Sequence, residues 1–500
     1  MARRQVRYEE YAAHGLMETG IHEDTEVKHV APSRVPSGGG ARGVKPPAHS
    51  AATSHRQNDA YMEAFDSAYE DLMERSGGLA HGSSKSHLHT SSLASVAPPR
   101  AVRTTGKEHS TREEEAAVSA HEELSGCWLS GPASPNGSLH SVSAQPVMCM
   151  SLSPDEREIV VGSSDHALYA IPIGSSAQTS RSTSRSAMGG GRPRTLYTKK
   201  FGHAEWVTCA TYLSDNRIVS GGMDSKLCLW DATGVKCEDL LGHSGSITLV
   251  RRLSSDLLLS ASYDKTVRVW NVSRKASNRQ REVSMIKAGS APILDASVLS
   301  TAAPRSVMTG DRDGCVHIVD LDDEKVSRKI VGAHKGHTTS VLASRFDESS
   351  LCFSGGQDGT VRVWDLRQKS SSPAHTLELH TDRKSGKAGA VGFLSEPDTD
   401  RNILITGGAD GTLKVLDKRK SFKTLFNFSE HMDFIYSLHV RGQLCFSGAG
   451  NGMLHVHDWK QGRLLYGLGA NKAAVRAIEI TPTQLIAAGD DGGVIIYEMN

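Results

Sequence analysis

Histidine and aspartate recur at one spacing in three stretches of this 500-residue chain. The histidine stands 21 residues before the aspartate in each of the pairs His203 and Asp224, His243 and Asp264, and His337 and Asp358. The same stretches contain serine, and Ser, His and Asp together are the residue types of a hydrolase triad. The set occurs three times, however, each time with a tryptophan and without a G-x-S-x-G elbow. We therefore expect a repeated structural role and no enzyme activity.

Other residue types that could bind a cofactor or metal do not form a recognisable motif. No G-x-x-x-x-G-K-[ST] phosphate loop is present. His455 and His457 alternate onto one face of an expected strand beside Asp458, but no further ligand stands at a metal-site spacing. We expect no metal and no cofactor.

The charge balance argues against nucleic acid as a partner. Lys plus Arg total 57 and Asp plus Glu total 56, which gives a net charge of +1. The basic clusters at 383–387 and 418–423 are short, and a single aromatic residue, Phe422, lies within them. Such clusters are usually solvated surface charge.

Alternating apolar residues and Gly/Asp-rich turns organise the chain from about residue 137 to 500. Eight hairpins share a turn residue, and successive turns are 40 to 59 residues apart. The turn residues are Asp165, Asp224, Asp264, Asp313, Asp358, Asp410, Asn451 and Asp491. Four short strands per unit of this length are typical of a β-propeller. We predict an all-β fold with a single closed ring of eight blades, with seven blades as the alternative.

Residues 1–136 differ in composition from this region. They are rich in Ser, Gly, Pro, His and Ala, and bury too little apolar surface to offset ordering entropy. We expect a largely disordered N-terminal arm with short helices at 58–75 and 110–124. The first of these is amphipathic, so it is either a docking peptide or a strap on its own domain.

Cysteine usage favours a reducing compartment. The eight cysteines are scattered singly with no C-x-x-C, and Cys228, Cys352 and Cys445 occupy strand positions expected of small buried hydrophobes. The N-terminus lacks the apolar core of a secretory signal, and no run of about 18 apolar residues is present. We expect a cytoplasmic protein without membrane contact, with nuclear or cytoskeletal/ciliary association as alternatives.

The hairpin region resembles the WD-repeat (WD40-type) β-propeller family. Gly–His pairs at 202–203, 242–243 and 336–337 open three units, which end in Trp–Asp or Trp–Asn. The resemblance implies a buried chain of hydrogen bonds from histidine to the turn aspartate and to a serine that also binds the tryptophan indole. The implied sets are His203, Ser220, Asp224 and Trp230; His243, Ser260, Asp264 and Trp270; and His337, Ser354, Asp358 and Trp364.

The other units depart from the family pattern. The first and eighth lack both His and Trp, and we expect packing alone to hold the divergent units. The chain ends after the third strand of the eighth unit, so residues 137–144 are expected to supply its outer strand. That exchange would remove two exposed sheet edges.

Recognition of proteins or peptides is the function that the resemblance implies. In this family the residues before the turn aspartate and before the first strand tend to face the binding surface. They correspond here to Trp206, Met223, Tyr263, Arg312, Gln357, Phe434 and Asp490. We therefore expect a non-catalytic scaffold that assembles a complex through this face and the N-terminal arm.

Two alternatives remain at this point. Trp364–Arg367 matches the W-D-x-R ending by which some WD-repeat proteins bind a ubiquitin-ligase adaptor, and Leu416–Arg419 is a weaker copy. The chain would then be a substrate receptor of a cullin-RING ligase, with Arg367 and Arg419 as adaptor contacts. The second alternative is a structural component of a cytoskeletal or ciliary assembly.

Overall fold

The structure is a computed structural model. It describes residues 126, 128–173, 193–197, 201–277, 280–299, 306–346, 350–368, 370–381 and 386–499. The chain divides into two compact units, 1–103 and 104–500, and all described residues belong to the second. The expected disordered arm and its helices at 58–75 and 110–124 lie outside the described residues.

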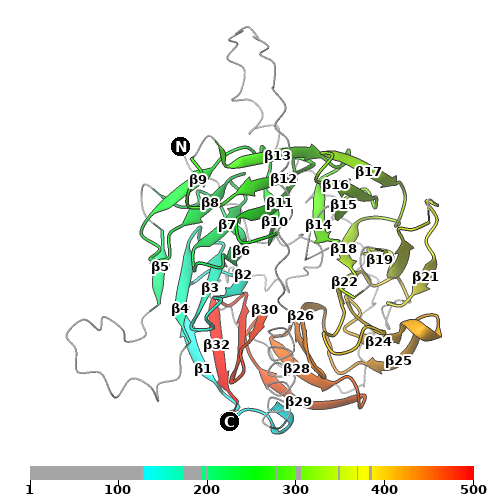
Figure 1. Ribbon diagram of the computed structural model, residues 1–500. Helices are drawn as coiled ribbons and strands as arrows, with labels where there is room; N and C mark the ends of the chain where they lie inside the picture. The colour runs from blue at the N-terminus through cyan, green and yellow to red at the C-terminus, as the bar shows by residue number, and fades with distance from the viewer. Residues whose placement is uncertain are drawn as a thin grey trace, which may run out of the picture. The chain divides into compact units, whose positions relative to one another are not determined.

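Within the described ranges, thirty-two strands form eight antiparallel four-stranded sheets that follow one another around a ring (Figure 1). The first four blades consist of β2 (Val147–Leu152), β3 (Glu158–Ser163), β4 (Leu168–Pro172) and β5 (Arg194–Leu196); β6 (Val207–Tyr212), β7 (Ile218–Gly222), β8 (Leu227–Trp230) and β9 (Cys237–Leu240); β10 (Ile247–Arg252), β11 (Leu257–Ser262), β12 (Thr266–Asn271) and β13 (Glu282–Lys287); and β14 (Ile293–Val298), β15 (Ser306–Asp311), β16 (Val316–Asp320) and β17 (Lys325–Ile330).

The next three blades continue the same order from the innermost to the outermost strand. They consist of β18 (Thr338–Ala343), β19 (Leu351–Gly356), β20 (Thr360–Asp365) and β21 (His375–Glu378); β22 (Val391–Ser395), β23 (Ile403–Gly408), β24 (Leu413–Asp417) and β25 (Lys423–Phe428), with the 3₁₀ turn η4 (Lys418–Lys420) between the last two; and β26 (Ile435–Arg441), β27 (Leu444–Ala449), β28 (Met453–Asp458) and β29 (Arg463–Gly469). The prediction of eight blades is confirmed, and the seven-blade alternative is wrong.

The eighth blade joins the two ends of the propeller sequence. Its strands are β30 (Val475–Ile480), β31 (Gln484–Gly489), β32 (Gly493–Glu498) and, outermost, β1 (Ser138–Ser141). The strand β1, cyan in Figure 1, lies antiparallel to the red β32, with Ser138 opposite Ile496 and Ser141 opposite Gly493. The segment expected to supply this outer strand does so, and the exchange leaves no open edge on β32.

Every innermost strand carries a register shift after its first residue. A β-bulge of this kind turns one extra side chain away from the regular alternation. Thr208 and Thr339 occupy this position, and their hydroxyls donate to the carbonyls of Ile247 at 2.6 Å and Val391 at 2.5 Å in the following blade. The bulge therefore supplies hydrogen bonds between neighbouring blades.

The hydrophobic core consists of eight separate clusters, each between two neighbouring blades. Each tryptophan of the repeated motif packs against the preceding blade; Trp230, for example, lies with Leu168 and Leu196 of blade 1. Trp128, which precedes β1, is also buried, and its ring meets Phe446 edge-on at 5.4 Å between blades 7 and 8. Because each cluster joins two neighbours only, the position of a blade depends on the blades beside it.

Candidate interaction surface

The predicted hydrogen-bond chain is present in blades 2 and 3. In blade 2 the ring nitrogens of His203 lie 2.9 Å from Asp224 Oδ1 and 2.8 Å from Ser220 Oγ, and Trp230 Nε1 donates to the same Oγ at 3.0 Å. In blade 3 the corresponding distances are 2.7, 2.7 and 2.8 Å, for His243 to Asp264, His243 to Ser260 and Trp270 to Ser260.

The direction of the bonds follows from the tryptophan. An indole N–H only donates, so the serine oxygen accepts from it and its own hydrogen points to histidine Nε2. Histidine Nδ1 then carries the proton that it donates to aspartate. Ser220 and Ser260 are fully buried and already engaged on both sides, so neither can act as a nucleophile toward a substrate.

In blade 5 the chain is made by His334 and not by His337. His334 lies 3.1 Å from Asp358 Oδ1 and 2.7 Å from Ser354 Oγ, which also accepts from Trp364 at 2.9 Å. The prediction of His337 was wrong because it counted back from the aspartate, and the loop between β18 and β19 is longer than the corresponding loops of blades 2 and 3. His203, His243 and His334 each stand four residues before their first strand, whereas His337 stands directly before Thr338.

The same position carries a polar residue in units where packing alone was expected. In blade 1 Ser143 donates to Asp165 at 2.6 Å, and in blade 8 Asn471 donates to Asp491 at 2.8 Å. In blade 6 His380, which precedes a longer loop, lies 2.9 Å from both Asp410 Oδ1 and Thr406 Oγ1. Ser143 and Asn471 are not histidines, and His380 follows Leu379 and lies 30 residues before Asp410, so a search for Gly–His at a fixed spacing misses all three.

Blades 4 and 7 use different arrangements. In blade 4 the position is Gly289, where a Cβ would come within 2.6 Å of His317 Nε2. His317 comes from β16 and binds Asp311 at 3.0 Å, so its imidazole fills the space of the missing loop histidine. In blade 7 His431 binds Ser447 Oγ at 2.7 Å and stacks on His455 with ring centroids 4.2 Å apart.

The aspartates of the chain are held in the charged form. Burial raises the pKa of Asp264, but hydrogen bonds from His243 and Thr266 outweigh burial and bring the pKa well below its usual range. The pKa values of Asp224, Asp358 and Asp410 are lowered against burial in the same way, chiefly by hydrogen bonds from His203, His334 and His380. Burial lowers the pKa of His243. At neutral pH the pair is therefore a neutral imidazole and a carboxylate.

A second set of bonds, made by the backbone, builds the predicted interaction face. In all eight blades, the residue that precedes the turn residue donates its backbone N–H to the carbonyl of the residue that precedes the first strand, at 2.8 to 3.0 Å. The pairs are Ser164 and Pro146, Met223 and Trp206, Tyr263 and Ser246, Arg312 and Pro292, Gln357 and His337, Ala409 and Ala390, Gly450 and Phe434, and Asp490 and Ala474. These sixteen residues are thereby placed around one end of the ring.

The predicted contact residues lie at this end but differ in exposure. Gln357 is exposed, and Trp206, Met223, Arg312 and Phe434 are half-buried. We call these five residues the ring face.

Two of the predicted contact residues differ from expectation: Tyr263 is buried, and Asp490 is held in an ion pair. Tyr263 is 3 % exposed, so its prediction as a surface contact was wrong: the ring is turned into the protein. Asp490 pairs with Arg476 through both carboxylate oxygens at 2.6 and 2.8 Å, and the guanidinium lies 4.7 Å from the Tyr436 ring centroid. The ion pair of blade 8 thus stacks on a tyrosine of blade 7 and connects the two blades.

Arg367 and Arg419 have the same environment in neighbouring blades. Each follows the third strand of its blade and binds the aspartate two residues earlier through Nε and Nη2 at 3.0 to 3.1 Å. Their side chains remain 70 % and 63 % exposed. Both guanidinium groups are therefore oriented by a carboxylate while facing solvent.

A candidate metal-binding group lies elsewhere, in blade 2. Of the residues that the structure describes, Cys228, Cys237 and Asp239 form the one group of three His, Cys, Asp or Glu side chains whose ligand atoms all lie within 4.8 Å. His455, His457 and Asp458, considered above for a metal, do not form such a group.

No helix within the described ranges is long and apolar enough to cross a membrane.

The model of the WD domain, G-beta repeat, matches residues 194–231, 235–271 and 328–365. Each match starts in or just before the outermost strand of one blade and finishes at the end of the third strand of the next. Together with the eight-bladed ring, these matches identify WD repeats in a β-propeller. The chain is an eight-bladed β-propeller that contains WD repeats. Its repeats thus link neighbouring blades, as the interblade core clusters do.

The chain is similar at low sequence identity to proteins that bear unrelated names. It is 24 % identical over 278 residues to Mitochondrial division protein 1 of Mycosarcoma maydis. The aligned region covers 49 % of this chain and 33 % of the relative. It is 28 % identical over 207 residues to the U5 small nuclear ribonucleoprotein 40 kDa protein of Dictyostelium discoideum, covering 38 % and 55 %. The chain therefore matches only part of the length of these proteins, and the similarity lies in the repeats.

Solved propellers share the fold at low sequence identity. Chaetomium thermophilum Sqt1, solved with the N-terminus of ribosomal protein L10, superposes with a TM-score of 0.59 at 16 % identity and covers 72 % of this chain and 98 % of Sqt1. Saccharomyces cerevisiae Sqt1 gives a TM-score of 0.61 at 12 % identity, covering 73 % and 99 %.

Proposed function

We propose that this WD-repeat protein is a non-catalytic scaffold that binds proteins or peptides through the ring face. The observation that carries the proposal is the set of eight equivalent backbone bonds before the turns. These bonds hold the ring face rigidly while leaving its side-chain types unconstrained. Trp206, Phe434 and Arg312 are residue types that often dominate binding energy at interfaces.

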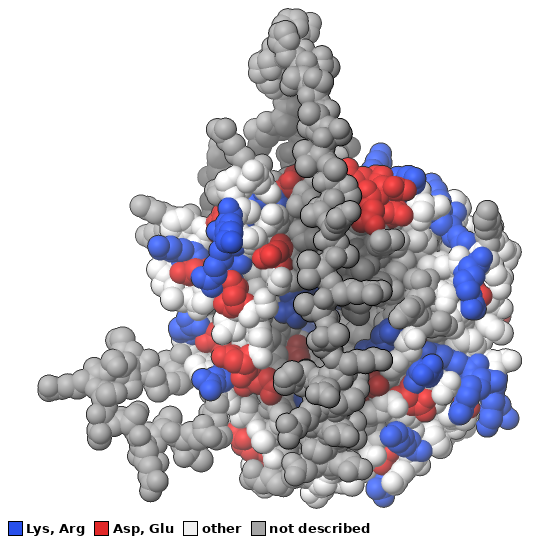
Figure 2. Space-filling view, viewed as in Figure 1, with Lys and Arg blue, Asp and Glu red and all other residues white. Residues whose placement is uncertain are grey.

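A protein partner fits the surface better than nucleic acid. The ring face carries one cation, Arg312, among aromatic and neutral side chains. On the side of the molecule shown in Figure 2, basic and acidic side chains occur in small interspersed groups, whereas nucleic-acid binding needs a continuous basic surface. The related fold of Sqt1, whose structure includes the N-terminus of a ribosomal protein, supports a peptide or protein as the bound class.

Affinity purification of the tagged full-length chain tests the proposal. The double substitution Trp206→Ala and Phe434→Ala should remove at least one partner that mass spectrometry finds with the unchanged chain. Val331→Ala is the matched control because Val331 is 71 % exposed and outside the ring face. An unchanged partner set in the double variant would contradict the proposal. Deletion of residues 1–110 asks separately whether the N-terminal arm contributes.

A second candidate, a substrate receptor of a cullin-RING ubiquitin ligase, is favoured by the paired geometry of Arg367 and Arg419. Two exposed, carboxylate-oriented guanidinium groups in neighbouring blades could bind an adaptor together. Arg367→Ala with Arg419→Ala should then abolish co-purification of the adaptor. Arg274→Ala is the control, since this side chain is 66 % exposed and also bound to an aspartate, Asp215. Retention of the adaptor by the double variant would rule out this docking mode.

We place the scaffold in the cytoplasm, with association with a cytoskeletal or ciliary structure or with the nucleus as alternatives. The dispersed cysteines support a reducing compartment. Fluorescence microscopy of the tagged chain, followed by detergent extraction, distinguishes a diffuse cytoplasmic protein from one retained on a cytoskeletal or nuclear structure.

A further inference from the structure

Three metal-ligating side chains meet on one face of blade 2. Cys228 lies on β8, and Cys237 and Asp239 lie on β9. Cys228 is directly opposite Asp239, and Cys237 is opposite Trp230. Because residues two apart on a strand share a face, the sheet register brings the two thiols and the carboxylate together.

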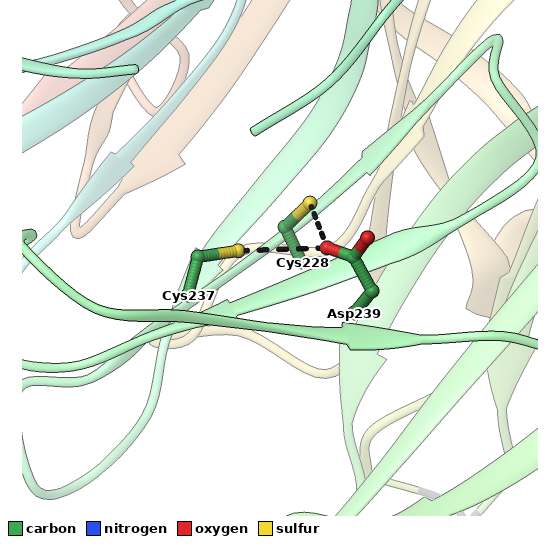
Figure 3. A group of neighbouring side chains, drawn as sticks. All are labelled: Cys228, Cys237 and Asp239. Atoms are coloured by element: carbon green, nitrogen blue, oxygen red, sulfur yellow. Dashed lines mark hydrogen bonds between the residues drawn. The ribbon is translucent and has the colours of Figure 1, made fainter. Parts of the chain in front are cut away.

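The distances between the three groups suit a shared cation. Asp239 Oδ1 lies 3.6 Å from Cys228 Sγ and 3.8 Å from Cys237 Sγ, and in Figure 3 both sulfur atoms point toward this oxygen. A tetrahedral zinc ion about 2.3 Å from each sulfur and about 2.0 Å from the oxygen would separate sulfur from oxygen by about 3.5 Å. The two sulfur–oxygen distances would need to shorten by only about 0.1 to 0.3 Å to match this geometry.

We propose that Cys228, Cys237 and Asp239 bind one thiophilic divalent cation, Zn²⁺. Two thiolates select zinc over magnesium or calcium, which prefer sites made only of oxygen. Three protein ligands leave a fourth position for water. The Asp239 side chain is 41 % exposed, which gives the ion an entry path from solvent, whereas Cys228 is fully buried.

Neighbouring residues already hold the ligands in place. Lys226 Nζ binds Asp239 Oδ2 at 2.9 Å and so leaves Oδ1 directed at the sulfurs. An outer partner of this kind commonly orients a metal ligand. Asp231 fixes the β8–β9 turn by accepting bonds from the N–H groups of Val235 and Lys236 at 2.9 and 3.0 Å.

Without the cation the site is a pair of thiols. A thiol binds the cation only as the deprotonated thiolate, so cation binding would release protons and weaken as the pH falls. A bound ion would join the outer strand β9 to β8 and so reinforce the outer edge of blade 2.

Cobalt titration of the reduced, metal-free full-length chain tests the site. Co²⁺ bound to thiolates absorbs strongly in the near ultraviolet, and we expect this band to saturate at one equivalent and to disappear when Zn²⁺ is added. Cys237→Ser and Asp239→Ala should weaken binding on the order of 100-fold or more, and Lys226→Met about 10-fold. Cys445→Ser is the control because Cys445 is a buried strand cysteine in blade 7.

Three results would overturn the proposal. The first is the absence of a thiolate band at equimolar cobalt. The second is a band of equal strength in Cys237→Ser and Asp239→Ala, which lie at the partly exposed end of the site and so are expected to leave the fold intact. The third is a Cys228–Cys237 disulfide in chain isolated under thiol-blocking conditions, because the sulfurs would then serve redox chemistry and not a metal.

Discussion

At the scale of single residues, the position four residues before an innermost strand anchors most blades. It carries histidine in blades 2, 3, 5 and 7, serine in blade 1 and asparagine in blade 8. A buried polar atom without a partner costs about 1–3 kcal/mol. The side chain can therefore change only to one that still bonds a neighbouring group, and this explains why the repeats remain structurally alike while their motifs diverge.

Alanine substitutions of the two candidate histidines of blade 5 distinguish the histidine that stabilises the blade from the one that does not. His334→Ala leaves Asp358 without its imidazole partner, and we expect the free energy of unfolding to fall by about 2–3 kcal/mol. His337→Ala removes no side-chain bond of the chain, because the blade contacts of His337 use its backbone N–H and carbonyl. Its effect should stay within about 0.5 kcal/mol. Urea denaturation of both variants measures the difference, and equal losses would contradict the assignment.

A buried ion pair in blade 6 accepts hydrogen bonds from the end of a strand in blade 5. Glu396, 1 % exposed, binds Lys418 Nζ and accepts from Ser344 Oγ at 2.9 Å and from the Arg345 N–H at 3.0 Å. Lys418→Met would leave this carboxylate buried without a cation. We expect a loss of about 3–5 kcal/mol, measured by denaturation.

Two controls make that measurement specific. Lys418→Met combined with Glu396→Gln should recover part of the loss, because no uncompensated charge remains. Lys325→Met removes an ion pair with Asp323 in which both side chains are about 60 % exposed, and it should leave the denaturation midpoint unchanged. A full, additive loss in the double variant would show that the pair is not coupled.

The sequence was sufficient to predict the tryptophans and aspartates of the hydrogen-bond chain, but not the lengths of the loops that place its histidines. Trp230, Trp270 and Trp364 and their turn aspartates stand at fixed distances because a hairpin has no room for insertions. The histidine is separated from the aspartate by a loop of variable length, and this explains the wrong assignment of His337 and the overlooked His380. The exposure of Tyr263 was unpredictable for another reason: a residue before a turn can point either way, and neighbouring blades decide which.

At the scale of elements, blade 7 differs from the others because it buries a group of histidines. His431, His455 and His457 lie close together, and Glu430 binds His457 at 3.3 Å. Nδ1 of all three histidines is buried without a hydrogen-bond partner in the structure. Burial and the neighbouring histidines lower the pKa of His431 from 6.5 to about 3. Burial also lowers the pKa of His457 to about 4, although Glu430 acts against it.

These shifts predict a loss of stability in mild acid. The unfolded chain takes up protons on these histidines below about pH 6.5, whereas the folded chain does not until its lower pKa values are reached. Each such histidine should lower the free energy of unfolding by about 1.4 kcal/mol per pH unit between about pH 6 and pH 4. His439, with a pKa lowered to about 4 chiefly by burial, acts in the same direction. The lowered carboxyl pKa values add their own loss only below about pH 4.

Denaturant midpoints at pH 7.5, 6 and 5 test this prediction. His431→Asn is the informative variant, because asparagine occupies the equivalent position in blade 8 and does not titrate. It should reduce the dependence of stability on pH, whereas His375→Ala, on the exposed outer strand β21, should not. An unchanged pH dependence in His431→Asn would show that the buried group does not control acid stability.

At the scale of the whole ring, closure depends on non-covalent contacts between distant parts of the sequence, above all the pairing of β1 with β32. Eight interblade clusters make each blade dependent on its neighbours, so an opening at blade 8 leaves two blades with one neighbour each. The prediction of closure from the sequence succeeded because β32 would otherwise leave an exposed sheet edge. The role of Trp128 was missed, since a single aromatic residue outside any repeat carries no periodic signal.

Gly137, which precedes β1, gives the sharpest test of this closure. Its φ is +57°, and a Cβ there would lie 2.7 Å from Ile495 Cγ2 and 2.9 Å from the Ile496 carbonyl oxygen. Gly332 has a similar φ of +64° but nothing within 4 Å of its Cβ position, so Gly332→Ala isolates the backbone cost of about 1–2 kcal/mol. Gly137→Ala adds the clash and should cost about 3 kcal/mol or more. Because displacement of β1 uncovers the edge of β32, this variant should also aggregate on mild heating, as light scattering would show. Equal stability and equal scattering in the two alanine variants would mean that β1 is not what holds the ring closed.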